Sequence, residues 1–182
     1  MRGIKRSQLV NMNQHYRRFS MERLGIGQIE LWCGAAHFWL DHTGYDDVSA
    51  LRAKLRAHGV RVVSVTAPSI AYQYQYAAQE PAHLEYSFRY FSNAIHLAAE
   101  LGAGRLVLGA AGACWDIEPE ALRRNAAGLL SALCPQAEAA GVRLLLAPVM
   151  GQETPLIAES PVLGRLEELS ELLRRVDRPA LG

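Results

Sequence analysis

The feature that most constrains the fold of this chain is a repeated alternation of short apolar runs with amphipathic stretches. The apolar runs are bounded by turn residues and are typical of strands buried on both faces. The stretches between them carry apolar residues at spacings of three and four, which indicates helices. The predicted strands are residues 7–13, 28–32, 60–67, 105–111 and 142–149.

A glycine stands where each of the first four helical stretches must end. Gly25, Gly59, Gly102 and Gly141 each precede a predicted strand by a few residues. A left-handed residue commonly closes a helix, and glycine adopts that conformation without steric cost. Strand, helix and capping glycine, repeated at intervals of roughly thirty to forty residues, predict the βα units of a parallel sheet.

A fifth helix is predicted over residues 160–176. Ser160 is suited to its N-cap and Pro161 to its first position. The residues from Arg178 onward look like the approach to another strand. The leucines expected on the apolar side of this helix are Leu163, Leu166, Leu169, Leu172 and Leu173.

Two sheet architectures are compatible with this pattern. A doubly wound sheet usually carries a glycine-rich phosphate loop, and neither GxGxxG nor GxxxxGK[ST] follows a predicted strand. A (β/α)8 barrel typically takes ~250 residues, so five units are a little over half of one. We therefore predict an α/β fold in which residues 1–182 form one domain. The missing loop counts against a doubly wound sheet, and the alternative is a partial (β/α)8 TIM barrel of about five βα units with parallel strands, truncated after the fifth unit, whose exposed sheet edges would allow self-association.

Composition excludes several classes of protein. Hydrophobic residues make up 50% of the chain and charged residues 20%, so the chain can bury a core and is not disordered. The net charge of +1 lacks the one-sided field of nucleic-acid-binding proteins. No apolar run approaches the ~20 residues that span a bilayer, and three cysteines without a CxxC pair argue against disulfides. We expect a cytoplasmic protein with no nucleic-acid or membrane partner.

The candidate functional residues follow the predicted strands, because parallel β/α folds keep their chemistry at the carboxyl ends of the strands. Aromatic and polar residues suited to a sugar gather there. The expected partner is therefore a small-molecule sugar. The substrate-binding candidates are His15, Glu30, Trp32, His37, Tyr72, Trp115 and Glu153.

Several of these residues have a plainer interpretation. A lone histidine such as His15 or His37 is more often a hydrogen-bonding loop residue than a ligand. Glu30 lies inside the apolar run QIELW, where an unpartnered carboxylate is costly to bury. It therefore either faces the mouth of the barrel or is paired.

The tyrosines and cysteines are open to similar alternatives. Tyr72, Tyr74 and Tyr76 alternate like an extended loop, and stacking on a substrate and packing of the loop are both compatible with that pattern. Cys33 and Cys114 match no known metal-site spacing and are interpreted as free thiols.

Five runs of sequence carry a family resemblance, in order and over nearly the whole chain. They are KRSQLVNMNQHYRRFS, IELWCGAAHFWLD, VVSVTAPSIAYQYQYAAQEP, HLEYSFRYFSNAIHLAAELGA and GVRLLLAPVMGQETP. The chain resembles the xylose isomerase-like TIM-barrel family of sugar phosphate isomerases and epimerases, near its fructoselysine 3-epimerase and ketose 3-epimerase branch. The resemblance implies a small-molecule sugar or sugar phosphate as partner and metal-assisted proton transfer at a carbon beside a ketose carbonyl. A Glu, Asp, His, Glu ligand set at the ends of the fifth to eighth strands would hold Mn²⁺, Mg²⁺ or Co²⁺.

The chain departs from the family at that ligand set. Where the family has the Glu of an LEP-type strand, this chain has Ala147, and the other three ligands would follow Gly182. We therefore expect no intact catalytic residues, no metal site and no cofactor in this chain. Three hypotheses about the function of this chain follow. It is an isomerase/epimerase-family domain that is inactive alone, a half enzyme completed by a partner chain, or a non-catalytic sugar-binding or interaction module.

Overall fold

The computed structural model of the protein describes residues 25–34, 38–67, 73–109, 117–147 and 166–182. Within them the chain forms a parallel sheet in the strand order β1-β2-β3-β4. The predicted strands at 28–32, 60–67, 105–111 and 142–149 are confirmed to within a residue at their starts, and the predicted strand at 7–13 lies outside the described residues. The strands are β1 Gln28–Trp32, β2 Arg61–Ala67, β3 Arg105–Gly109 and β4 Arg143–Ala147.

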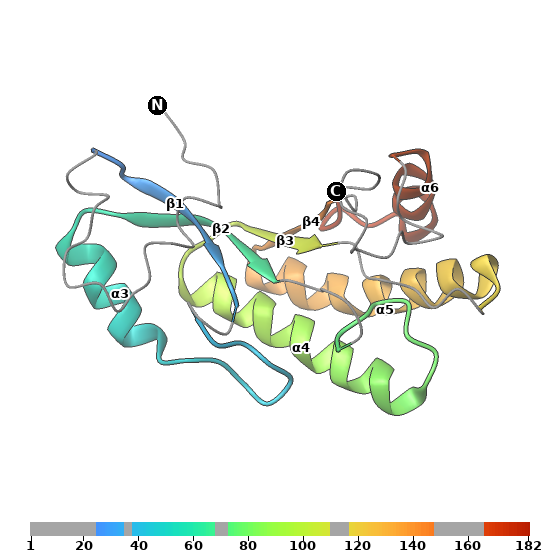
Figure 1. Ribbon diagram of the computed structural model, residues 1–182. Helices are drawn as coiled ribbons and strands as arrows, with labels where there is room; N and C mark the ends of the chain where they lie inside the picture. The colour runs from blue at the N-terminus through green and yellow to red at the C-terminus, as the bar shows by residue number, and fades with distance from the viewer. Residues whose placement is uncertain (1–24, 35–37, 68–72, 110–116, 148–165) are drawn as a thin grey trace, which may run out of the picture.

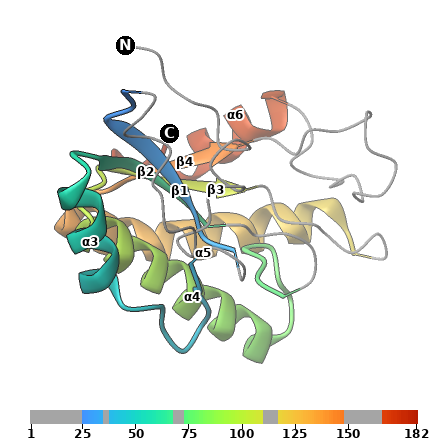
Figure 2. The same cartoon turned by 60° about the vertical axis from the view of Figure 1, so that its left-hand side comes forward.

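Helices follow the strands, as the sequence predicts. They are α3 Val48–Ala57, α4 Pro81–Glu100, α5 Pro119–Ala140 and α6 Leu166–Val176. The first three form one layer beneath the sheet, and α6 lies beside α5 and contacts it (Figures 1 and 2). This arrangement is that of a partial (β/α)8 barrel. No helix in the described parts of the chain is both long and apolar enough to cross a membrane.

The predicted capping glycines have the left-handed conformation expected of them. Gly25, Gly59, Gly102 and Gly141 have φ values of 66°, 63°, 67° and 66°. Gly141 shows the consequence best, because it is the C-cap of α5 and its N–H donates to the carbonyl of Glu138. One residue later Val142 donates to the carbonyl of Ala137, and the chain turns directly into β4.

The core lies between the sheet and the layer of α3, α4 and α5. Residues two apart on a strand share a face, and on β3 and β4 this places Leu106, Leu108 and Leu144 toward the helices, where their side chains have no exposed surface. Phe91 and Ile95 of α4 are equally buried. Each fully buried side chain of this kind contributes about 1.5–3 kcal/mol of transfer free energy, so this face of the sheet dominates the stability of the fold.

The predicted apolar faces of the helices are mostly confirmed. Val48, Leu51 and Leu55 of α3 are buried, as are Leu169 and Leu172 of α6. The expectation for Leu166 is wrong, since 69% of that residue is exposed. At 100° per residue, Leu166 lies at the margin of the stripe formed by the buried residues, in the first turn of α6.

A β-bulge sets the register between β1 and β2. Ile29 lies opposite Val62, and the next residue, Glu30, lies opposite Ser64, so Val63 is an extra residue on β2. A bulge of this kind reverses which face the flanking residues occupy. Because of the extra residue, Val62 is buried opposite Ile29, while Ser64, two positions later on β2, lies opposite Glu30 on the other face.

The last residues of the chain pair with β4. The N–H of Leu144 donates to the carbonyl of Ala180 at 2.7 Å, and the N–H of Gly182 donates to the carbonyl of Leu144 at 2.8 Å. Leu144 and Leu181 form a parallel bridge. The prediction that residues after Arg178 approach another parallel strand is therefore confirmed.

Candidate functional site

The face of the sheet opposite α3, α4 and α5 is here called the open face. Its rows follow from the strand register: Trp32, Thr66, Val107 and Leu145 stand side by side on the four strands. Three of these residues are half-buried and Thr66 is buried. Because the strands are parallel, this row lies near their common carboxyl ends, where β/α folds place their sites.

Glu30 lies on the open face and is also hydrogen-bonded. It precedes Trp32 by two residues on β1, and one of its carboxylate oxygens accepts a hydrogen bond from the hydroxyl of Thr66 on β2. Glu30 therefore lies on the open face and is also paired, so the two alternatives predicted for it hold together. Glu30 is only half-buried, so its carboxylate keeps access to solvent and to a ligand.

The indole of Trp32 lies directly against Gly34. A Cβ atom at Gly34 would fall 2.0 to 2.7 Å from three carbon atoms of the Trp32 ring, far inside van der Waals contact. Any side chain at position 34 would therefore displace the indole. A glycine at this position leaves room for the indole, and Trp32 is half-buried on the open face.

Ala147 is the last residue of β4 and lies one row beyond Leu145 on the open face, in register with Gly109. A methyl group cannot ligate a cation, and Gly109 contributes no side chain either. Among the residues that the structure describes, no group of three His, Cys, Asp or Glu residues could hold a metal ion. The described part of the open face does not fit a divalent cation, and the absence of a metal in this chain stays a prediction.

The structure describes two of the seven predicted substrate-binding residues, Glu30 and Trp32, and brings them together on β1. The side-chain positions of the other five lie outside the described residues, and their roles stay predictions. These are His15, His37, Tyr72, Trp115 and Glu153.

Two of the tyrosines in the loop after β2 pack into the core. Tyr76 has no exposed surface and Tyr74 is 6% exposed. Tyr74 stacks on Tyr90 of α4, with ring centroids 4.0 Å apart and planes 6° from parallel. Its hydroxyl accepts a hydrogen bond from the N–H of His42 at 3.3 Å, and burial raises the pKa of Tyr74. For Tyr74 and Tyr76 the interpretation as loop packing is correct.

The loop that carries Trp39 lies against α4, on the helical side of the sheet. The side-chain amide of Asn93 donates to the carbonyl of Asp41 at 2.9 Å, and the indole N–H of Trp39 donates to the Asp41 carboxylate at 2.9 Å. Although 47% of Trp39 is exposed, its loop follows the helical layer. It is the indole of Trp32 that lies on the open face.

The described cysteines are free thiols, as predicted. Cys33 and Cys134 are buried and unpaired with each other, and Cys114 lies outside the described residues. Burial raises the pKa of the Cys33 thiol strongly, so this residue stays protonated and unreactive. Its N–H donates to the carbonyl of Thr66 at 2.9 Å, which extends the pairing of β1 with β2.

Two residues of the site were not among the predicted candidates. In the sequence Thr66 is only a polar residue at the end of a strand. Its contact with Glu30 depends on a bulge that no sequence pattern predicts. Gly34 follows the predicted strand in an ordinary turn position. The proximity of its α-carbon to Trp32 depends on the rotamer of the indole, which no periodic pattern encodes.

Comparison with known proteins identifies the family. The family model described as xylose isomerase-like TIM barrel matches residues 20–182. The chain belongs to this family. A curated relative, fructoselysine 3-epimerase of Shigella flexneri, is 25% identical over 137 residues, which cover 75% of this chain and 50% of that protein. The chain thus spans about half the length of the curated relatives it matches.

Solved structures show the same fold. The structure of an L-ribulose 3-epimerase superposes with a TM-score of 0.69 at 17% identity and covers 87% of this chain and 50% of its own. The IolI protein, solved with a bound zinc atom, gives a TM-score of 0.64 at 16% identity, over 89% of this chain and 53% of its own. These likenesses show the fold, and the family model confirms the predicted membership of the xylose isomerase-like TIM-barrel family.

Proposed function

We propose that this chain is a cytoplasmic, single-domain member of the sugar isomerase/epimerase family, over residues 1–182, that has no epimerase activity by itself. The observation that supports this is Ala147, which stands at the carboxyl end of β4 on the open face, where the family resemblance implies a metal-binding Glu. A proton beside a ketose carbonyl is a weak acid, and a cation is needed to stabilise the enediolate that forms when it leaves. A chain without that first ligand loses this stabilisation.

Solvent exchange tests the proposal. The protein is incubated with D-fructose in D₂O and Mn²⁺, and deuterium incorporation at the carbon next to the carbonyl is followed by NMR. We expect no incorporation above that of Mn²⁺ alone. Incorporation that requires the protein and is abolished by a chelator would overturn the proposal.

A second candidate function is metal-free sugar binding. Two contacts on the open face favour it: the hydrogen bond from Thr66 to Glu30 and the packing of the Trp32 indole against Gly34. An indole presents an apolar face on which the C–H groups of a sugar ring can stack. The free oxygen of the Glu30 carboxylate can accept hydrogen bonds from sugar hydroxyls. Since the charged group described at this end of the open face is a carboxylate, a neutral sugar is favoured over a sugar phosphate.

Thermal unfolding in the presence of a chelator tests this candidate. A panel of free ketoses and their phosphates is added to the protein, and binding raises the unfolding temperature by mass action. We expect a rise with a free ketose that is lost in Trp32→Leu and reduced in Glu30→Gln. Trp39→Leu is the matched control, because Trp39 is exposed on the helical side and should leave the rise unchanged. No rise across the panel, or a rise that Trp32→Leu leaves intact, would contradict it.

Self-association through sheet edges is also part of the proposal. Among the described strands β1 pairs on one side, with β2, and the predicted strand at 7–13 lies outside the described residues. A strand edge that no segment of this chain covers can accept a second copy or a partner chain. Sedimentation equilibrium over a range of protein concentrations measures this self-association.

A further inference from the structure

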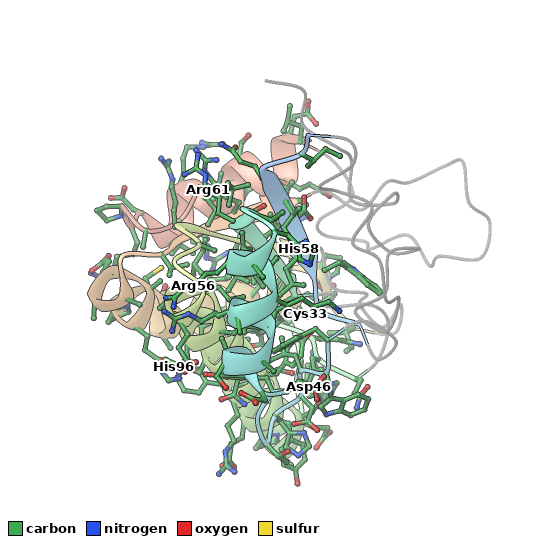
Figure 3. All side chains as sticks on the ribbon, turned by 90° about the vertical axis from the view of Figure 1, so that its left-hand side faces the viewer. Cys33, Asp46, Arg56, His58, Arg61 and His96 are labelled. Carbon is green, nitrogen blue, oxygen red and sulfur yellow. The ribbon has the colours of Figure 1, made fainter. Side chains whose placement is uncertain are left out.

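A groove of about 750 Å³ lies on the helical layer, between α4 and the last turns of α5, away from the open face. Its lining includes His42 from the loop after β1, Arg89, Ser92 and His96 from α4, and Gln136 and Ala139 from α5. Figure 3 shows His96 at the outer surface of this layer. Neither the core nor the proposed sugar site accounts for this groove.

Ser92 is the unusual residue of the groove. It is only 9% exposed, and its hydroxyl oxygen is buried without a hydrogen-bond partner. Most buried polar side-chain atoms in proteins have a partner, and each exception calls for an explanation. The Ser92 oxygen has almost no exposed surface in its present rotamer, so a ligand in the groove could accept its hydrogen bond only after the hydroxyl rotates toward the groove.

The described lining residues offer donors and no carboxylate. Arg89 carries a positive charge, and the ring of His96 and the amide of Gln136 offer N–H groups, whereas Nδ1 of His42 lies 2.9 Å from the hydroxyl of Tyr74. Two carboxylates of α4 are already engaged: Glu100 accepts a hydrogen bond from the hydroxyl of Tyr45 at 2.7 Å, and Glu85 pairs with Arg89. That pair is more than half-exposed on both sides, so it is weak and Arg89 can turn into the groove.

We propose that this groove binds the oxyanion head of a small molecule, a carboxylate or a phosphate monoester, with Ser92, Arg89 and His96 as its hydrogen-bond donors. The hydroxyl of Ser92 donates to one oxygen at the floor of the groove. Arg89 supplies the charge at the rim, and Ala139 leaves room for the body of the ligand. The site is independent of the sugar site, because the helical layer separates the two.

Titration with inorganic phosphate and, separately, with butyrate at constant ionic strength tests the proposal and distinguishes the two head groups. We expect one of the two to raise the unfolding temperature saturably. Ser92→Ala should weaken the affinity about tenfold, the loss expected for a hydrogen bond to a charged group. Without the anion, the same variant should unfold at a higher temperature than the parent, because it removes the unpartnered hydroxyl.

Two further variants complete the design. Ala139→Leu fills the groove from an exposed helix position and should abolish the saturable rise. Ser131→Ala, on the same helix but outside the groove, should leave it unchanged. The proposal is overturned if neither anion produces a saturable rise, or if the rise is the same in Ser92→Ala and Ala139→Leu as in the parent protein.

Discussion

The two faces of the same sheet differ in almost every physical respect. On the helix side, alternate residues of β2, β3 and β4 such as Val65, Leu106 and Leu144 are wholly buried and apolar. On the open face, the residues between them include a carboxylate, a hydroxyl, an indole and the methyl group of Ala147. The helix side forms the core that specifies the fold, and the proposed sugar site lies on the open face, so the fold and the proposed function depend on different residues of the same sheet.

The largest expected effect is at the centre of the helix side. Leu106→Ala should lower the free energy of unfolding by about 2–5 kcal/mol, because it removes buried methyl groups and leaves a cavity. Val107→Ala, one residue later on the half-buried open face, should cost less than about 1.5 kcal/mol. Urea denaturation of the two variants measures the difference. Equal losses would show that the two faces are covered to the same extent.

The next effect concerns the indole on the open face. Gly34→Ala places a methyl group within the Trp32 ring and should cost about 1–3 kcal/mol of stability through overpacking. It should also change the tryptophan fluorescence and remove ketose binding. Gly104→Ala is the control, since a Cβ there meets nothing within 4 Å. If both variants behave like the parent protein, Trp32 does not lie against Gly34.

A smaller effect is expected at the pair formed by Glu30 and Thr66. Thr66→Val replaces the hydroxyl donor by a methyl group and should lower stability by about 0.5–1.5 kcal/mol, the net value of one hydrogen bond. Thr66→Val should also weaken sugar binding, because Glu30 loses its hydrogen-bond donor. Thr66→Ser keeps the donor and should restore most of the sugar affinity, whereas it would not do so if Thr66→Val acted only by steric disturbance. Denaturation and sugar titration of both variants decide between these outcomes.

The smallest effect lies in the loop on the helical side. Partial burial of Asp41 would raise its pKa, but hydrogen bonds from Thr43, Trp39 and Gly44 outweigh it and lower the pKa. A lowered pKa gives stability that is present above the unfolded value of about 3.9 and is lost as the pH falls through the folded value. Asp41→Asn should therefore destabilise the protein at neutral pH, and the difference should shrink as the pH falls below about 3.9 toward the lowered folded value. A difference that does not shrink as the pH falls would locate its cause elsewhere.

Most of the fold was predictable, because its signals are local and repeated. The apolar runs gave four of the strands, and the glycine at position 141 marked the end of α5 correctly. Leu166 was misassigned because a residue at the margin of a helical stripe is buried only if a neighbour covers that turn, which periodicity cannot show. The resemblance identified the family, and the register of β4 placed Ala147 where the metal ligand was expected.

The candidate site was less predictable, because it depends on contacts between strands. The partner of Glu30 was left open, since only the bulge between β1 and β2 brings Thr66 beside it. The burial of Tyr74 could not be predicted either, because a tyrosine exposed in a loop and one stacked on Tyr90 have the same sequence pattern. Contacts of this kind are set by register and rotamers rather than by spacing.

The most direct test of the account is a titration with Mn²⁺, followed by electron paramagnetic resonance of the free ion. The central claim is that the open face keeps groups suited to a sugar and lacks the site for a metal. The account predicts no binding at micromolar concentration by the parent protein or by Ala147→Glu, because one carboxylate without partners holds a divalent ion weakly. One equivalent of Mn²⁺ bound with micromolar affinity by the parent protein would contradict it.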